Sequence, residues 1–266
     1  MNYKQLLIDN FTYKISYIAR LIHGMNVKET KDYIAVDCGL PADTFNIITL
    51  LNNSLTSGVE QLHSEVTYFN QKKFPMSVWF WNNGQEQIIQ SELLNLGLKE
   101  AEHNIAMVVD LKTLHPTINM PVGFTIQKAS SSGQIQRFGE TLADLFGESE
   151  EGINVQAFYK QISTFDIWNS ENMKLYLGFY NDEVVSVGSL VSTKDSIGIY
   201  DIATKEEMRG RGFGTTMFNF LLQEAKQLKD THCVLQASPD GINIYKKSGF
   251  QAVGKMSVFE NRHLFE

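Results

Sequence analysis

The sequence predicts an α/β protein with a mixed sheet, organised as two domains. In both halves of the chain, short apolar runs typical of strands alternate with segments whose apolar residues recur at helical spacing. Residues 112–121 contain two prolines between these halves and are the expected linker. We therefore expect an N-terminal α/β domain over residues 1–115 and a second domain over residues 121–266.

Composition narrows the function classes. The chain has 266 residues, of which 43% are hydrophobic, so it can bury a sizeable core. Its net charge is −7 and no cluster of Lys and Arg is present, which argues against a nucleic-acid partner. An acidic chain also suits a cationic amine substrate, although acidic proteins are common.

Targeting and redox signals are sparse. Cys38 and Cys233 make no disulfide framework, which predicts a reducing, cytoplasmic compartment. The N-terminus lacks the apolar stretch of a signal peptide, and no segment is long and apolar enough to predict a membrane span. The six histidines show no ligand spacing, so no metal site is expected.

Apolar spacing and turn residues predict the individual elements. In the first half we expect helices over 1–24, 57–70 and about 88–96, and strands over 33–36, 45–51, 75–81 and 105–111. In the second half we expect helices over 131–146, 155–165, from 214 onward and over 241–248, and strands over 124–127, 175–179, 184–191, 199–203 and 233–238. A tight turn at 181–183 should join two of these strands.

An acidic segment, residues 147–152, is expected to be a loop. It contains Glu148, Glu150 and Glu151. These carboxylates could attract an ammonium group. A solvated charged loop is the favoured alternative.

The most informative stretch is residues 198–214, GIYDIATKEEMRGRGFG. It predicts a strand, a charged turn, a glycine-rich loop and the start of a helix. The first N–H groups of a helix lack intrahelical partners and carry partial positive charge, and glycines let a phosphate approach the backbone. With Arg209 and Arg211 on the same loop, we expect it to hold the pyrophosphate of a coenzyme.

Two other phosphate-binding motifs do not fit this loop. A P-loop would need a Gly-Lys-Ser/Thr ending, and no lysine is present there. A dinucleotide fingerprint starting at Gly210 would need a third glycine at the position of Thr215.

The pattern R-x-x-G-x-G, formed by Arg209, Gly212 and Gly214, resembles the acetyl-coenzyme A (acetyl-CoA) motif of the GNAT N-acetyltransferases. A second signature follows after one helix and one strand: a short helix with Tyr245, then the Lys-x-Gly-Phe of residues 247–250. Two signatures in this order identify residues 121–266 as similar to a GNAT domain.

The first half resembles the N-terminal halves of two-domain GNAT proteins. These halves are often degenerate copies of the fold that bind no coenzyme. The resemblance rests on the run at 79–81, the following helix and the strand at 106–111. An unrelated α+β cap is the alternative.

The resemblance implies roles for the coenzyme-binding residues. Backbone groups of Ile202, Ala203 and Thr204 should pair with the pantetheine arm and lie near the thioester oxygen. The loop N–H groups that should hold the pyrophosphate belong to Arg209, Gly210, Arg211, Gly212, Phe213, Gly214 and Thr215. Ser238 stands where the family often has an asparagine that contacts the coenzyme, which puts that contact in doubt. Asn243 is a substitute donor or an exposed helix residue.

For catalysis, Tyr245 matches the tyrosine that many family members use as general acid for the leaving thiolate, with simple packing as the alternative. The general base is less defined. Tyr200 and Asp201 point to opposite faces of an ideal strand, and the family's register turns Tyr200 toward the site. The family's usual acidic position is Gly198. Asp201 would reach the site only across a strand irregularity, and a water chain is an alternative base.

These inferences predict an acetyl-CoA-dependent N-acetyltransferase that moves an acetyl group to a primary amine of a small molecule or peptide by direct attack. The alternative is a non-catalytic, regulatory GNAT-like protein that binds acyl-CoA. No nucleic acid, membrane or metal is expected as partner or cofactor. The amine, the acyl group (succinyl is one alternative) and the oligomeric state, with a homodimer as one arrangement, are left open.

Overall fold

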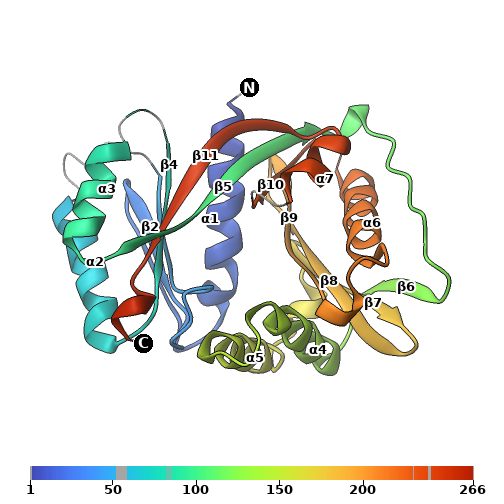
Figure 1. Cartoon of the computed structure of the whole chain (residues 1–266), viewed down its shortest axis with the longest axis horizontal. Coiled ribbons are helices and arrows are strands. Elements are labelled where there is room, and N and C mark those ends of the chain that lie inside the picture. Colours follow the sequence, from blue (N-terminus) through green and yellow to red (C-terminus); the bar gives the residue numbers. More distant parts are fainter. Residues whose placement is uncertain are drawn as a thin grey trace.

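The computed structural model describes residues 2–51, 59–82, 84, 86–229, 231–238 and 241–265. Within these residues, one mixed sheet of eleven strands runs through the molecule in the order β1-β2-β3-β4-β11-β5-β10-β9-β8-β7-β6 (Figure 1). The strands are β1 (Asn26–Glu29), β2 (Tyr33–Asp37), β3 (Ile47–Leu50), β4 (Ser77–Trp81), β5 (Lys99–Asp110), β6 (Phe124–Lys128), β7 (Met173–Tyr180), β8 (Glu183–Ser192), β9 (Ser196–Thr204), β10 (His232–Ala237) and β11 (Gln251–Glu260). The predicted α/β class with a mixed sheet is confirmed.

The helices cover both faces of this sheet. They are α1 (Tyr3–Leu21), α2 (Val59–Lys72), α3 (Glu86–Asn95), α4 (Ser132–Ala143), α5 (Glu150–Ile162), α6 (Phe213–Leu228) and α7 (Ile242–Lys247). In Figure 1, α1 lies between the two halves of the sheet, α2 and α3 lie outside the N-terminal half, and α6 and α7 lie outside the C-terminal half. Helix α1 contacts β1 and β2 as well as β8, β9 and β10, so it is shared by both halves.

Most strands and helices lie where apolar spacing predicts them. All five residues of β2 are buried, because helices cover both faces of the sheet there, and its first four residues, 33–36, form the continuous apolar run expected of such a strand. Strand β1 was not predicted, since its sequence, NVKE, is polar and mostly exposed at the sheet edge. The expected tight turn is present: Asn181 and Asp182 both have positive φ, of 51° and 63°.

The C-terminal strand β11 was also not predicted, and its position organises the molecule. It lies between β4 and β5, antiparallel to both, with Met256 opposite Trp81 and Lys255 opposite Ile105. Residues from the end of the chain therefore complete the sheet of the N-terminal half. Strands from before and after residues 112–121 belong to the same sheet. A domain boundary at these residues stays a prediction.

The prediction that residues 147–152 form a loop is wrong for the second part of this segment, which is helical. Helix α5 begins at Glu150, after Ser149 caps its N-terminus by accepting a hydrogen bond from the Gly152 N–H. Glu150 and Glu151 thus occupy the first helical turn, where carboxylates are favoured by the helix dipole.

Neither cysteine forms a disulfide: Cys38 and Cys233 are both buried thiols. Among the described residues, the helices are all too short or too polar to cross a bilayer.

Candidate functional site

The glycine-rich loop has the backbone conformation that its sequence predicts. Gly210 and Gly212 have φ of +75° and +86°, in the left-handed region that favours glycine. A Cβ at either position would meet no atom within 4 Å, so the backbone of the loop faces open space. A Cβ at Gly214 would lie 2.9 Å from Thr204 Oγ1, so this glycine lets α6 start directly against the end of β9. The loop is therefore an open cradle at a helix N-terminus.

A pocket of about 380 Å³ adjoins this cradle. It is lined by the loop from Arg209 to Thr215, by Ile202 and Thr204 of β9, and by Tyr245 of α7. The Arg209 side chain donates from Nε to the Thr204 carbonyl at 3.3 Å, and Arg211 is exposed to solvent. The pocket combines open backbone N–H groups with the Arg209 cation, and Arg211 lies on the same loop, which is the chemistry that binds phosphates.

Strands β9 and β10 separate next to this pocket. They pair in parallel over Ser196–Gly198 and His232–Val234, and the pairing stops there although both strands continue. Ile202, Ala203 and Thr204 lie in the part of β9 beyond this pairing. On its other side this part of β9 pairs with β8. The edge of β9 that faces the gap can thus take up one extended chain.

A cleft of about 580 Å³ lies between the two halves of the sheet. Its walls come from α1, β4, β9, β10 and β11, with Trp79 from the first half and Leu235 from the second. Ile202 and Tyr245 line both this cleft and the pocket beside the loop. The two spaces therefore adjoin at these two side chains.

Asp201 lies at this cleft because β9 is irregular. Val187 of β8 pairs with Ala203 and Ser189 pairs with Tyr200, so Asp201 and Ile202 together oppose a single residue. Asp201 takes φ of +55°, as the extra residue of a bulge. Both Tyr200 and Asp201 line the cleft, instead of pointing to opposite faces of a regular strand.

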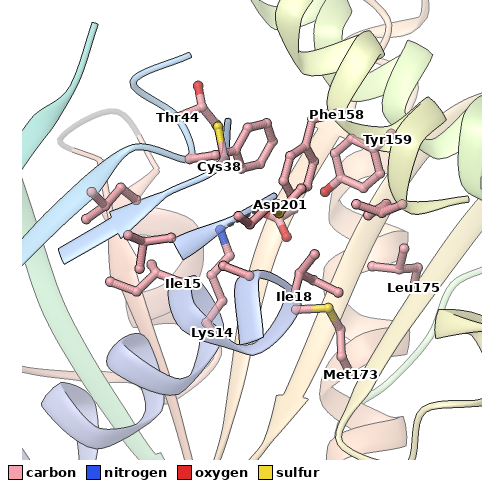
Figure 2. A pocket seen from close by; sticks show the side chains of 16 residues that line it. Lys14, Ile15, Ile18, Cys38, Thr44, Phe158, Tyr159, Met173, Leu175 and Asp201 are labelled. Atoms are coloured by element: carbon pink, nitrogen blue, oxygen red, sulfur yellow. Dashed lines mark ion pairs between the residues drawn. The ribbon is translucent and has the colours of Figure 1, made fainter. Parts of the chain in front are cut away.

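The Asp201 carboxylate has two partners. Lys14 Nζ of α1 lies 3.1 Å from Oδ1 (Figure 2). The Ser189 hydroxyl donates to Oδ2 at 2.8 Å. Both charged side chains of the ion pair are 15% exposed. Lys14 was not predicted as a site residue, because nothing near it in the sequence marks a helix lysine as facing a site 187 residues away.

Tyr200 and Gly198 are covered by α1. The Tyr200 hydroxyl donates to Asn10 Oδ1 at 2.8 Å, and the Gln236 amide lies against the same hydroxyl. Burial, reinforced by the charge of Asp201, raises the pKa of Tyr200 well above its ordinary value. A Cβ at Gly198 would lie 2.2 Å from Asn10 Oδ1, so the family's usual acidic position has no room for a side chain.

Tyr245 both packs and reaches the site. Its ring lies edge-on to Phe218 at 5.0 Å between centroids and close to Phe250. Burial raises the pKa of its hydroxyl, so Tyr245 stays protonated at neutral pH. Ser238 also lines the central cleft, whereas Asn243 is exposed on α7 and lines neither the cleft nor the loop pocket.

The glutamates of the acidic segment separate into two kinds. Glu148 and Glu150 are exposed, as a solvated charged segment requires. Glu151 is buried, so the interpretation of the segment as a solvated charged loop is wrong for this residue. Its Oε1 accepts hydrogen bonds from the Thr44 N–H, at 3.1 Å, and from the Thr44 hydroxyl. Burial is the main cause that raises the pKa of Glu151.

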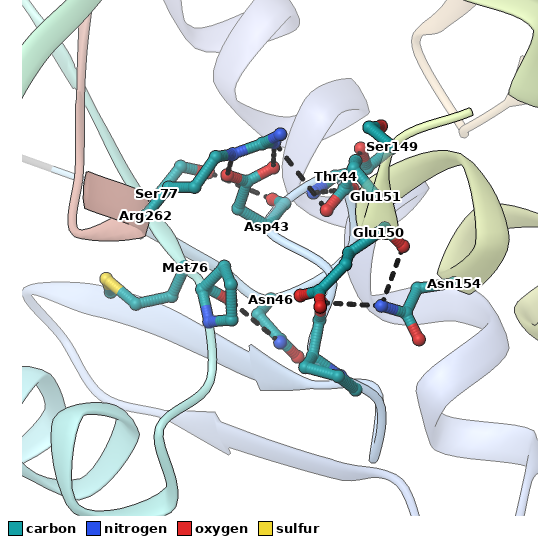
Figure 3. A network of polar contacts seen from close by, with 12 residues as sticks. Asp43, Thr44, Asn46, Met76, Ser77, Ser149, Glu150, Glu151, Asn154 and Arg262 are labelled. Carbon is teal, nitrogen blue, oxygen red and sulfur yellow. Dashed lines mark hydrogen bonds and ion pairs between the residues drawn. The ribbon is translucent and has the colours of Figure 1, made fainter. Parts of the chain in front are cut away.

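Arg262 joins this glutamate to the N-terminal half (Figure 3). Its guanidinium donates two hydrogen bonds to Asp43, at 2.8 and 2.5 Å, and lies 3.6 Å from Glu151 Oε2. The network ties α5, the segment before β3 and the chain end after β11 together at one wall of the cleft. Sequence reasoning missed it, because its members are more than 100 residues apart.

In the part of the chain that the structure describes, no three His, Cys, Asp or Glu side chains are arranged to hold a metal ion.

Comparison with known proteins supports the predicted family. Residues 145–265 match the family model of the acetyltransferase (GNAT) domain. No curated protein matches the chain in sequence. The predicted resemblance of the C-terminal half is confirmed by the family match.

Solved structures resemble the whole chain. A GCN5-related N-acetyltransferase from Kribbella flavida superposes with a TM-score of 0.66 at 12% identity, over 96% of this chain and 95% of that one. A conserved protein of unknown function from Staphylococcus epidermidis has the same TM-score at 16% identity, over 93% and 96%. A tandem GNAT protein from the clavulanic acid biosynthesis pathway has a TM-score of 0.60 at 9% identity, over 97% and 94%. At these identities the likeness shows the fold, which the chain shares with two-domain GNAT proteins.

Proposed function

Because residues 145–265 form a GNAT acetyltransferase domain, we propose that this chain is an acetyl-CoA-dependent N-acetyltransferase acting on a primary amine of a small molecule or peptide. The observation that carries the proposal is the junction at Ile202 and Tyr245. There the phosphate-binding chemistry of the loop pocket meets a large cleft that contains a carboxylate, Asp201. A coenzyme in the pocket and an amine in the cleft would meet at this junction.

The residues present fit the coenzyme. The open backbone from Arg209 to Thr215 would hold the pyrophosphate, since Gly210 and Gly212 leave its N–H groups accessible. The free edge of β9 at Ile202, Ala203 and Thr204 would pair with the pantetheine arm in the gap between β9 and β10. The N-terminal half has no counterpart of this loop and would instead supply a wall of the amine site.

Two side chains would move protons in the proposed reaction. When bound, acetyl-CoA supplies a thioester whose carbonyl carbon the amine attacks, so that a C–N bond forms as the C–S bond breaks. Asp201 would accept a proton from the amine nitrogen, and Tyr245 would donate one to the departing thiolate. A buried phenol suits this role, because its raised pKa keeps the proton available at neutral pH.

The charge of the cleft favours an ammonium group over an anion. Of the ionisable side chains that line it, four are carboxylates (Asp43, Glu102, Asp201 and Glu260) and two are cations (Lys14 and Arg262). This excess of negative charge would concentrate cationic amines near Asp201.

Two measurements test the proposal. Calorimetry with acetyl-CoA should give one site per chain, and release of free thiol should appear when a panel of primary amines is added. Absence of coenzyme binding would overturn the proposal. Binding without thiol release for any amine would favour the alternative of a non-catalytic acyl-CoA-binding protein.

A further inference from the structure

A second, smaller cavity lies behind Asp201, on the side of α1 (Figure 2). It has a volume of about 40 Å³. We propose that this cavity is a subsite for a short alkyl group, one or two carbons long, carried by one of the two reactants. The inference rests on the proposed acetyl transfer and adds to it the size and chemistry of a substituent that the enzyme selects.

The cavity adjoins the central cleft at a defined place. Lys14, Thr44, Ile47 and Asp201 line both spaces. The Lys14–Asp201 ion pair therefore marks the boundary between a charged cleft and the space behind it. Ile202, the next residue of β9, lines the coenzyme pocket. A group that extends from the reacting centre past Asp201 would enter the cavity.

Most of the residues that line the cavity are apolar, and the polar ones include Lys14, Thr44, Tyr159 and Asp201. Its walls include Ile18 and Ala19 of α1, Phe158 of α5, and Met173 and Leu175 of β7. The Cys38 thiol in the wall stays neutral, because burial raises its pKa to about 12. The apolar part of this wall suits a small apolar group.

The volume limits what can bind. A dry cavity of about 150 Å³ binds benzene, which has six carbons, so 40 Å³ accommodates a group of one or two carbons. The same alkyl chemistry has two sources. It is either the part of an acyl chain beyond acetyl or a substituent on the amine whose nitrogen lies at Asp201.

A chain-length series distinguishes these sources. Acetyl-, propionyl- and butyryl-CoA are compared with one amine, and methyl-, ethyl- and propylamine are compared with acetyl-CoA. Each methylene that enters the cavity should raise kcat/KM about fourfold, and the rise should stop after one or two carbons. A rise in one series assigns the cavity to that reactant. Measurable rates that show no such rise in either series overturn the proposal.

A second measurement needs no turnover. Met25 and Met173 line the cavity, so their ¹³C-labelled methyl groups report on its contents by NMR. Titration with butyryl-CoA or propylamine should shift one or both signals, while buried Met107, which lines neither space, stays unchanged. Shifts without thiol release would refute the proposed function and leave the subsite standing. Unshifted Met25 and Met173 signals with every ligand would refute the subsite.

Variants of α1 change the size of the cavity. Ala19→Leu should fill it and abolish both the chain-length rise and the methyl shifts. If Ala19→Leu does not fold, Ile18→Val provides the test, since it removes one methylene from the wall and should move the preferred chain one carbon longer. Ile8→Val is the matched control, because Ile8 is buried on the same helix and lines neither space. An identical chain-length profile in wild type and Ile18→Val would contradict the proposal.

Discussion

Asn10 and Tyr200 are 190 positions apart in the sequence and are joined by a 2.8 Å hydrogen bond from the tyrosine hydroxyl to Asn10 Oδ1. The Asn10 amide also donates to the Val191 carbonyl and to the Ser196 hydroxyl. The first helix is thereby fixed onto β9, the strand that borders the pocket beside the glycine-rich loop. The same asparagine fills the space above Gly198, so the two halves of the chain build this wall together.

Asn10→Ala should destabilise the fold by about 1–3 kcal/mol, because it removes the acceptor of the buried Tyr200 hydroxyl and a donor to the buried Val191 carbonyl. Asn154→Ala is the matched control: Asn154 also bonds two backbone carbonyls, but it is only half-buried. Urea denaturation of both variants measures the difference. Equal losses in the free energy of unfolding in the two variants would show that the buried Asn10 contacts stabilise the fold no more than the half-buried Asn154 contacts do.

Gly212→Ala should weaken acetyl-CoA binding at least tenfold. The added methyl lies over the open cradle, and the left-handed φ also costs a non-glycine residue about 1–2 kcal/mol. Gly24→Ala carries the same conformational penalty far from the loop, with φ of +95° and open space around the added Cβ. Calorimetry should show loss of affinity in Gly212→Ala alone. Full affinity in a folded Gly212→Ala variant would contradict the assignment of the loop.

Tyr245→Phe should lower kcat by roughly 10²–10⁴-fold with little change in coenzyme affinity, because the ring still packs on Phe218 and only the proton donor is lost. Burial raises the pKa of this hydroxyl, so the wild-type rate should fall only at a pH above the ordinary tyrosine value of about 10. That falling limb should be missing from the variant. Tyr176→Phe, which removes another buried hydroxyl outside the cleft, should leave the profile unchanged. Unaltered turnover in Tyr245→Phe would make Tyr245 a packing residue.

Asp201→Asn should reduce kcat by a similar roughly 10²–10⁴-fold if the carboxylate is the general base. Asparagine tolerates positive φ and can still accept from the Ser189 hydroxyl, so the bulge should persist. Asp182→Asn, at another positive-φ position in an exposed turn, is the control. Unchanged kcat in a folded Asp201→Asn variant would show that a water chain, and not this carboxylate, is the base.

Glu151→Gln should change how stability depends on pH. Burial raises the pKa of Glu151 in the folded protein, so the folded state binds more protons than the unfolded state as pH rises above the ordinary value of 4.5. This carboxyl therefore makes the free energy of unfolding fall with rising pH from that value upward. The variant keeps both acceptor bonds from Thr44 and should lose this contribution. The difference in stability between wild type and variant, measured from pH 4.5 to 8, should grow in favour of glutamine. The neighbouring, exposed Glu150 gives the control Glu150→Gln, and equal behaviour of both variants would contradict the buried role.

Local features of this protein were predictable from the sequence. The positive φ at Gly210 and Gly212 is a property of glycine in a strand-to-helix loop, and the apolar spacing of α6 is contained in consecutive residues. The coenzyme loop and its neighbouring strand and helix could therefore be placed without coordinates. The same holds for the buried strand β2, whose first four residues form a continuous apolar run.

Long-range features depended on the tertiary structure. The ten residues of β11 carry no signal that places them between β4 and β5, because strand neighbours are chosen by packing across the whole sheet. The bulge that turns Asp201 into the cleft arises from the register of β9 with β8. In an ideal strand, alternation would point Tyr200 and Asp201 to opposite faces. Lys14 and Asn10 look like ordinary residues of an amphipathic helix until α1 packs on β9. Sequence determined the groups that could bind a coenzyme, since local backbone preferences act within a few residues. Only the fold decided which side chains surround the reacting centre, since contacts between distant segments exist only once the core has packed.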